Sequence, residues 1–251
     1  MESTTVETSD GVKLHVLLFN PQSDVDDPKP NTVIVMVHPF TLLGGSQGLL
    51  RGTAMGLAER GFKAVTFDTR GAGRSSGRAS LTGFSEVQDV IAVCKWVKEN
   101  LNPAGVVLVG SSAVNVFGKY SFQHTGSNIC VQIFVLRTRP QWEERLVRLQ
   151  LIKLDDVVGY VSLGYPFGLT ASILFGRHHE AILKSTKPKL FVMGTKDVFT
   201  SVKQFKNKLK SASGRVETHL LEGTTHFQME GPAYDAKMAD LITTFVQSLQ
   251  G

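Results

Sequence analysis

The sequence predicts an α/β fold in which a mainly parallel central sheet is covered by helices on both faces. Short apolar runs that suit buried strands alternate along the chain with segments whose apolar residues recur at helical spacing. This alternation is typical of parallel sheets, because the crossover between parallel strands is usually a helix. A length of 251 residues suffices for one such domain with a sizeable core. We therefore expect residues 1–251 to form a single domain.

The first predicted elements are a β-hairpin and a central strand. Asp10 and Gly11 favour a tight turn, and they lie between the alternating segments 5–7 and 12–19. Residues 32–37 read Thr-Val-Ile-Val-Met-Val. Continuous hydrophobicity of this kind is typical of a parallel strand that is buried on both faces.

Two helices and two strands are predicted next. Residues 48–59 have helical period, and Gly61 is a suitable C-terminal stop. Residues 62–67 predict the following strand. A Ser-Glu-Val-Gln capping-box pattern opens the helix predicted at 85–101. Residues 106–109 form another apolar run, which predicts a third buried strand.

The alternation breaks between residues 114 and 150 and then resumes. The second half of the chain again shows short apolar runs separated by helical patterns. Its predicted elements are a strand at 157–163, a short helix near 180–184, a strand at 190–193, a basic helix at 201–210, a strand at 215–221 and a helix at 233–249.

The composition is that of a soluble globular protein, with 42% apolar and 20% charged residues. The N-terminus is polar, so we expect no signal peptide, and no apolar run reaches the length of roughly 18 residues that a membrane span needs. The two cysteines, Cys94 and Cys130, make a poor disulfide framework, which favours a reducing compartment. We expect a cytoplasmic protein in which Cys94 packs in the core.

The net charge of +5 is unevenly distributed. Residues 114–150 carry five basic and two acidic side chains, and a second basic cluster lies on the helix predicted at 201–210. A nucleic-acid interface is one interpretation of such a helix. The chain has no recognised nucleic-acid motif and no aromatic residues between these lysines, so a solvated helix face is favoured and no nucleic-acid partner is expected.

Three residues stand in an order that predicts nucleophilic catalysis: Ser112, Asp197 and His226. Each follows a short apolar run that predicts a strand, so all three belong to loops at the carboxyl edge of the sheet. A serine hydroxyl needs a neighbouring base, and a histidine in that role needs a carboxylate to orient it. Each residue alone also has an ordinary explanation, as a turn serine, a helix cap or a surface histidine. Their common placement favours the catalytic interpretation.

Five short motifs surround these residues. They are His38-Pro39 with Gly44-Gly45, Asp68-x-Arg70-Gly71-x-Gly73-x-Ser75, Gly110-x-Ser112, Gly194-x-x-Asp197, and His226. In these motifs the sequence resembles the α/β-hydrolase superfamily, and it is most similar to small members with little lid, related to dienelactone hydrolases and serine aminopeptidase-like esterases. The resemblance implies a carboxyl-ester, thioester or amide hydrolase that forms an acyl-enzyme and uses no cofactor.

The same resemblance implies an oxyanion hole made by two main-chain N–H groups. One comes from the loop after the strand at 32–37, where Pro39 has no N–H, so that Phe40 or Thr41 must donate; we assign Phe40. The other comes from Ala113, the residue after the nucleophile. The interval between the strands at 157–163 and 190–193 is too short for a large cap domain, which implies an open, shallow pocket.

Two further patterns give weak signals for other sites. Gly71, Gly73 and Gly77 resemble a dinucleotide loop, but their spacing is wrong and no helix opens directly after them. His178 and His179 precede a glutamate, but adjacent histidines point in different directions and no third ligand is evident. We expect neither a dinucleotide nor a metal.

The match to the superfamily stops at the nucleophile turn. The expected Gly-x-Ser-x-Gly reads Gly110-Ser-Ser-Ala-Val114, and the residues after it do not predict the helix that should follow. Two interpretations of residues 114–150 follow. The segment comes from an alternative transcript or an imperfect gene model, or it is a genuine inserted lid or partner-binding loop.

The sequence as a whole predicts a serine hydrolase that acts on a small-molecule acyl substrate. Ser112 is the expected nucleophile, His226 the general base and Asp197 the residue that orients it. The alternative is a catalytically inactive scaffold or ligand-binding protein, which the departure at Val114 favours. The substrate and the oligomeric state stay open.

Overall fold

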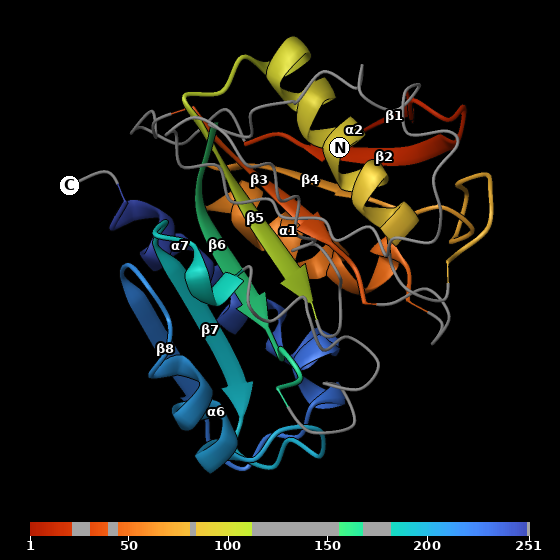
Figure 1. Cartoon of the computed structure of the whole chain (residues 1–251). Helices are drawn as coiled ribbons and strands as arrows, with labels where there is room; N and C mark the ends of the chain where they lie inside the picture. The colour runs from red at the N-terminus through yellow and green to blue at the C-terminus, as the bar shows by residue number, and fades with distance from the viewer. Residues whose placement is uncertain (22–30, 40–44, 81–83, 112–155, 168–181, 250–251) are drawn as a thin grey trace, which may run out of the picture.

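A computed structural model of the chain describes residues 1–21, 31–39, 45–80, 84–111, 156–167 and 182–249. Within these residues, eight strands form one sheet in the order β1-β2-β4-β3-β5-β6-β7-β8 (Figure 1). The strands are β1 (Glu2–Glu7), β2 (Lys13–Phe19), β3 (Thr32–Val37), β4 (Lys63–Phe67), β5 (Gly105–Ser111), β6 (Val157–Leu163), β7 (Lys189–Gly194) and β8 (Val216–Leu221). Strand β2 pairs antiparallel with β1 and β4, and every pair from β4 to β8 is parallel.

Helices cover both faces of this sheet, as predicted (Figure 1). The described helices include the 3-10 turns η2 (Gln47–Leu50), η4 (Phe227–Glu230) and η5 (Pro232–Tyr234), and the α-helices α1 (Arg51–Glu59), α2 (Phe84–Leu101), α6 (Val202–Leu209) and α7 (Asp235–Gln247). Helices α1 and α7 pack in one hydrophobic cluster on one face. Helices α2 and α6 contribute to a second cluster on the other face. The predicted α/β fold class is confirmed.

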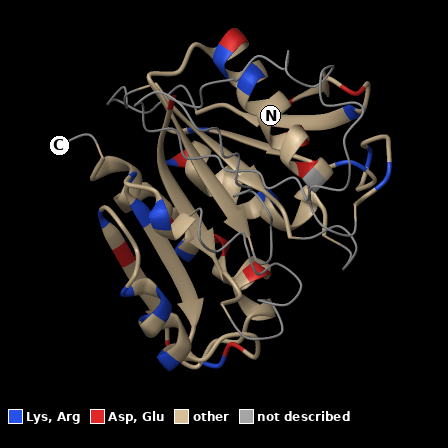
Figure 2. Ribbon diagram, in the orientation of Figure 1, with Lys and Arg blue, Asp and Glu red and all other residues tan. Residues whose placement is uncertain are grey.

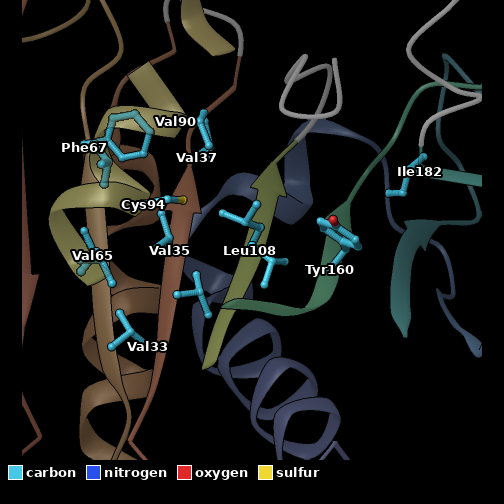
Figure 3. Close-up of a cluster of buried hydrophobic side chains, with 14 of the residues drawn as sticks. Val33, Val35, Val37, Val65, Phe67, Val90, Cys94, Leu108, Tyr160 and Ile182 are labelled. Carbon is cyan, nitrogen blue, oxygen red and sulfur yellow. The ribbon is translucent and has the colours of Figure 1, made fainter. Parts of the chain in front are cut away.

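The central strand β3 explains why continuous apolar runs occur in this sequence. Val33, Val35 and Val37 face the cluster that includes α2, where Figure 3 shows them packed near Val65, Phe67 and Leu108. Ile34 and Met36 face the opposite cluster. Both faces of the strand are fully buried, and burial of each such side chain contributes about 1.5–3 kcal/mol. Cys94 is buried in the first cluster, as expected.

The helix boundaries differ from the predicted ones in two places. The segment predicted as one helix at 48–59 is a 3-10 turn followed by α1, and Gly61 ends it with a φ of +88°. The capping box expected at Ser85 is wrong. Helix α2 begins at Phe84, so Ser85 lies inside the first turn rather than at the N-cap. The neighbouring Glu86 carboxylate accepts hydrogen bonds from the main-chain N–H and the hydroxyl of Ser80.

The basic helix α6 has a solvated outer face. Its N-terminus is closed by a capping box in which the Ser201 hydroxyl accepts from the N–H of Gln204 and the Gln204 side chain accepts from the N–H of Ser201. Phe205 is the buried residue of the helix. The lysines on α6 and at its C-cap point to solvent, where Figure 2 shows blue segments along the helix. In the described parts of the chain, no helix is both long and apolar enough to cross a membrane.

A buried arginine joins the N-terminal hairpin to the rest of the fold. The Arg70 guanidinium donates to Asp89 at 2.8 Å and to Asp10 at 2.7 Å. Asp89 is fully buried on α2, and Asp10 lies in the turn between β1 and β2. Hydrogen bonding to Arg70 lowers the pKa of Asp10 to about 2. The contribution of Asp10 to stability is therefore present above the unfolded pKa of about 4 and is lost as the pH falls toward 2.

We expect Arg70→Ala to lower the free energy of unfolding by about 3–5 kcal/mol, because it leaves the buried Asp89 carboxylate without its cation. Urea denaturation followed by circular dichroism measures this change. Arg74→Ala is the matched control: its side chain is exposed, and the free energy should change by less than about 0.5 kcal/mol. Equal losses in both variants would contradict the structural role of Arg70.

Candidate active site at the carboxyl edge of the sheet

The predicted catalytic residues follow strands that end at the same edge of the sheet. Strands β5, β6, β7 and β8 are parallel neighbours, with Ser111 paired to Leu163 and Gly194 paired to Leu221 at their carboxyl ends. Asp197 lies in the loop after β7, and His226 lies in the loop after β8. Ser112 directly follows Ser111, the last residue of β5.

Main-chain hydrogen bonds hold the loops after β7 and β8 together. The N–H of Thr195 donates to the carbonyl of Leu221, and the N–H of Lys196 donates to the carbonyl of Thr224, each at 2.9 Å. Gly194 makes this approach possible, because a Cβ at that position would lie 2.2 Å from the carbonyl oxygen of Thr224. The glycine of the Gly-x-x-Asp motif is thus needed for packing rather than for flexibility.

Asp197 and His226 form a buried hydrogen bond. The His226 Nδ1 atom lies 2.6 Å from the Asp197 Oδ2 atom, and the two side chains are 2% and 1% exposed. The other carboxylate oxygen of Asp197 accepts from the N–H groups of Phe199 and Thr200 at 2.8 and 2.9 Å. Because a carboxylate can only accept, the Nδ1 atom carries the hydrogen, and Nε2 is the atom of the neutral ring that can take up a proton.

Packing fixes the plane of the His226 ring. The rings of Phe199 and Phe227 contact it edge-on, with centroid distances of 4.7 and 5.4 Å. On another side lies Gly164, just after β6, where a Cβ would come within 3.2 Å of the His226 Cε1 atom. Val198, Phe199 and Phe227 are exposed apolar side chains, so the imidazole borders an apolar surface.

Sequence reasoning missed Glu230, which the structure places at the same edge. The Ser111 hydroxyl donates to Glu230 Oε1 at 3.1 Å. Burial raises the pKa of Glu230, while the electrostatic interaction with His226 and the hydrogen bond from Ser111 act in the opposite direction. No motif in the sequence pointed to this residue, because it is defined by a contact between segments 119 positions apart.

The start of the predicted oxyanion loop is held by a neutral histidine. His38 Nε2 accepts the N–H of Thr69 at 3.0 Å, so the Nδ1 atom is the donor to the carbonyl of Pro39 at 2.6 Å. Burial lowers the pKa of His38. A Cβ at Gly45 would lie 1.9 Å from the carbonyl oxygen of Pro39. The two ends of the loop between these residues are therefore in contact.

The glycine loop after β4 encloses a carboxylate of the protein itself. Asp68 accepts from the N–H groups of Gln47 and Arg74, at 3.0 and 3.1 Å. A Cβ at Gly73, which has a φ of +48°, would lie 2.2 Å from the Asp68 Oδ2 atom. The N–H of Arg74 in this loop, a group that would otherwise suit a phosphate, is thus used by a carboxylate of the protein itself.

Several predicted residues lie outside the described parts of the chain. These are Ser112, Ala113 and Phe40, the segment 114–150, and the pair His178 and His179. Their roles stay predictions. Among the described residues, no group of three or more histidine, cysteine, aspartate or glutamate side chains is arranged to hold a metal ion.

Comparison of the sequence with known families gives one partial match. A family model described as X-Pro dipeptidyl-peptidase (S15 family) matches residues 10–120. The matched range is less than half of the chain and spans strands β2 to β5, whereas Asp197 and His226 lie beyond it. No curated protein matches the sequence.

Solved structures with a similar fold include serine hydrolases and esterases. An α/β serine hydrolase homologue from Coxiella burnetii is 22% identical, with a TM-score of 0.65 over 96% of this chain and 94% of its own. A serine hydrolase without a lid from Xanthomonas campestris is 18% identical, with a TM-score of 0.70 over 98% and 94%. An esterase from Thermogutta terrifontis, solved with propionate bound, is 16% identical, with a TM-score of 0.68 over 99% and 94%. The resemblance to the α/β-hydrolases is thus confirmed at the level of the fold.

We expect Gly194→Ala to lower the free energy of unfolding by about 1–3 kcal/mol, because the new methyl group must push the Thr224 carbonyl away. Urea denaturation measures the change. Gly48→Ala is the matched control, since its Cβ would meet nothing closer than the Ser46 hydroxyl at 3.5 Å, an ordinary contact. Indistinguishable midpoints for the two variants would show that the loops do not depend on this close approach.

Proposed function

We propose that this chain, which has the α/β-hydrolase fold, is a serine hydrolase that cleaves carboxyl esters or related acyl compounds. The observation that carries the proposal is the buried hydrogen bond between His226 and Asp197 at the carboxyl edge of the sheet. The same edge receives the chain from β5, whose last residue directly precedes Ser112. Acyl transfer needs a hydroxyl, an imidazole and a carboxylate, the groups of Ser112, His226 and Asp197.

In the first half of the proposed reaction, the Ser112 oxygen attacks the substrate carbonyl carbon while His226 Nε2 takes the hydroxyl proton. Asp197 keeps the Nδ1 hydrogen in place and stabilises the imidazolium that forms. The main-chain N–H groups of Phe40 and Ala113 stabilise the oxyanion of the tetrahedral intermediate. The intermediate then collapses, the bond to the leaving group breaks, and His226 protonates the departing alcohol.

In the second half, water replaces the alcohol and cleaves the acyl-enzyme. His226 Nε2 takes a proton from the water as its oxygen attacks the acyl carbon. The bond to the Ser112 oxygen then breaks, and the proton passes from His226 to that oxygen. The products are the free carboxylic acid and the original enzyme, so no cofactor or metal enters the balance.

The surface beside His226 supports an acyl substrate with an apolar portion. Val198, Phe199 and Phe227 are 72%, 37% and 64% exposed, and two of them contact the imidazole. An apolar acyl or alcohol group that covers them gains about 25 cal/mol for each Å² of apolar surface removed from water. The propionate bound to the Thermogutta terrifontis esterase is a small carboxylate of the kind such a reaction releases.

A fluorophosphonate probe, which phosphonylates activated serine hydroxyls, should label the wild-type protein at Ser112. Peptide mass spectrometry distinguishes this residue from Ser111. In Ser112→Ala, labelling and hydrolysis of a short nitrophenyl ester should both be lost. Absence of labelling and turnover in the wild type, together with thermal stabilisation by the ester, would instead support the inactive ligand-binding alternative.

We expect Asp197→Asn to lower kcat for the nitrophenyl ester by about 10³- to 10⁴-fold with little change in KM, because the amide no longer fixes the correct tautomer of His226. Steady-state kinetics measures both constants. Asp240→Asn is a matched control on α7, where the carboxylate pairs with Arg60 at the surface, and its kcat should stay within about twofold of wild type. Full turnover in Asp197→Asn would refute the role of this carboxylate.

A further inference from the structure

The strands that bring the candidate nucleophile and base to one edge are not neighbours. Strands β6 and β7 lie between β5 and β8 (Figure 1). With a spacing of about 4.8 Å between strands, β5 and β8 are about 14 Å apart. The hydrogen bonds of the sheet therefore do not connect the last residues of β5 directly to the loop after β8. Contacts outside the strands must hold these two segments together.

The hydrogen bond between Ser111 and Glu230 is such a contact. Ser111 is 2% exposed, and its hydroxyl donates to Glu230 Oε1 at 3.1 Å. Ser111 is the last residue of β5, so its main chain continues directly into Ser112. One hydrogen bond thus reaches from the residue before the candidate nucleophile to the segment that follows His226.

Glu230 is in turn firmly connected to His226. It closes the 3-10 turn η4, whose N-cap is His226, and the N–H of Gly231 donates to the carbonyl of Gln228 at the end of that turn. Met229, one residue earlier, is buried in the core cluster on the α7 face. The main chain at Glu230 is therefore held close to His226 by a single 3-10 turn.

Glu230 does not compete with Asp197 for the imidazole. The Nδ1 atom of His226 is already bonded to Asp197, and the Glu230 oxygen that is hydrogen-bonded faces Ser111. The geometry assigns the two carboxylates different partners at the same edge.

We propose that Glu230 is a positioning residue, which holds Ser111 and thereby fixes the chain at Ser112 against the turn that carries His226. The proposal rests on the proposed function, because it concerns the alignment of Ser112 with the base. A misplacement of about 1 Å in such an alignment costs about 100-fold in rate.

A double-mutant cycle tests this role, with kcat and KM for the nitrophenyl ester and the rate of fluorophosphonate labelling as readouts. We expect Ser111→Ala and Glu230→Ala each to lower kcat by about 10- to 100-fold while KM stays within about twofold. The double variant should be no slower than the slower single variant, because both changes remove the same hydrogen bond. Effects that multiply, or singles as fast as wild type, would overturn the proposal.

The conservative variants Glu230→Gln and Glu230→Asp separate position from charge and from folding. Glutamine keeps the length and the acceptor oxygen, so kcat should stay within about threefold of wild type. Aspartate keeps the charge, but its side chain is one methylene shorter and its oxygens lie farther from Ser111. The kcat should therefore fall about as far as in Glu230→Ala. The reverse order would overturn the proposal. If the wild-type protein is not labelled at Ser112, the proposed function itself is refuted, and the positioning role with it.

Discussion

The parallel register of the central sheet is the constraint on which the candidate site depends. Strands β3 to β8 run in one direction, so every loop that follows β5, β7 and β8 emerges at the same edge. That arrangement requires helices on both faces, because the strands are apolar on both sides and must be shielded from water. Residues far apart in sequence become neighbours as a direct consequence of how the core is buried.

Buried charges at this edge are satisfied by groups that are themselves fixed. Asp197 accepts two main-chain N–H groups in addition to His226, and Asp68 accepts N–H groups from the segment before α1 and from its own glycine loop. A buried carboxylate without such partners would destabilise the fold by several kcal/mol. The same hydrogen bonds that make the charges tolerable also hold the loops in place, as the proposed acyl transfer requires.

Local sequence signals located the elements well and their ends less well. The strand and helix order followed from hydrophobic period, because burial on one or two faces leaves a direct mark on the sequence. The expected cap at Ser85 was wrong, since helix α2 already begins at Phe84 and the pattern of a capping box does not reveal where the helix starts. At Ser201 the same kind of pattern does form a capping box, because the side chain of Gln204 points back to its own N-cap.

The sequence by itself determined the α/β fold, the order of the strands along the chain, and the loops that carry Asp197 and His226. These depend on apolar period and on residue type, which are local properties. Tertiary structure alone decided that His226 Nδ1 meets Asp197, that Gly194 must lack a side chain beside Thr224, and that Glu230 bonds to Ser111. Such contacts join segments that are 29 to 119 residues apart, and their geometry is set only when the sheet register and the packing of the loops are fixed together.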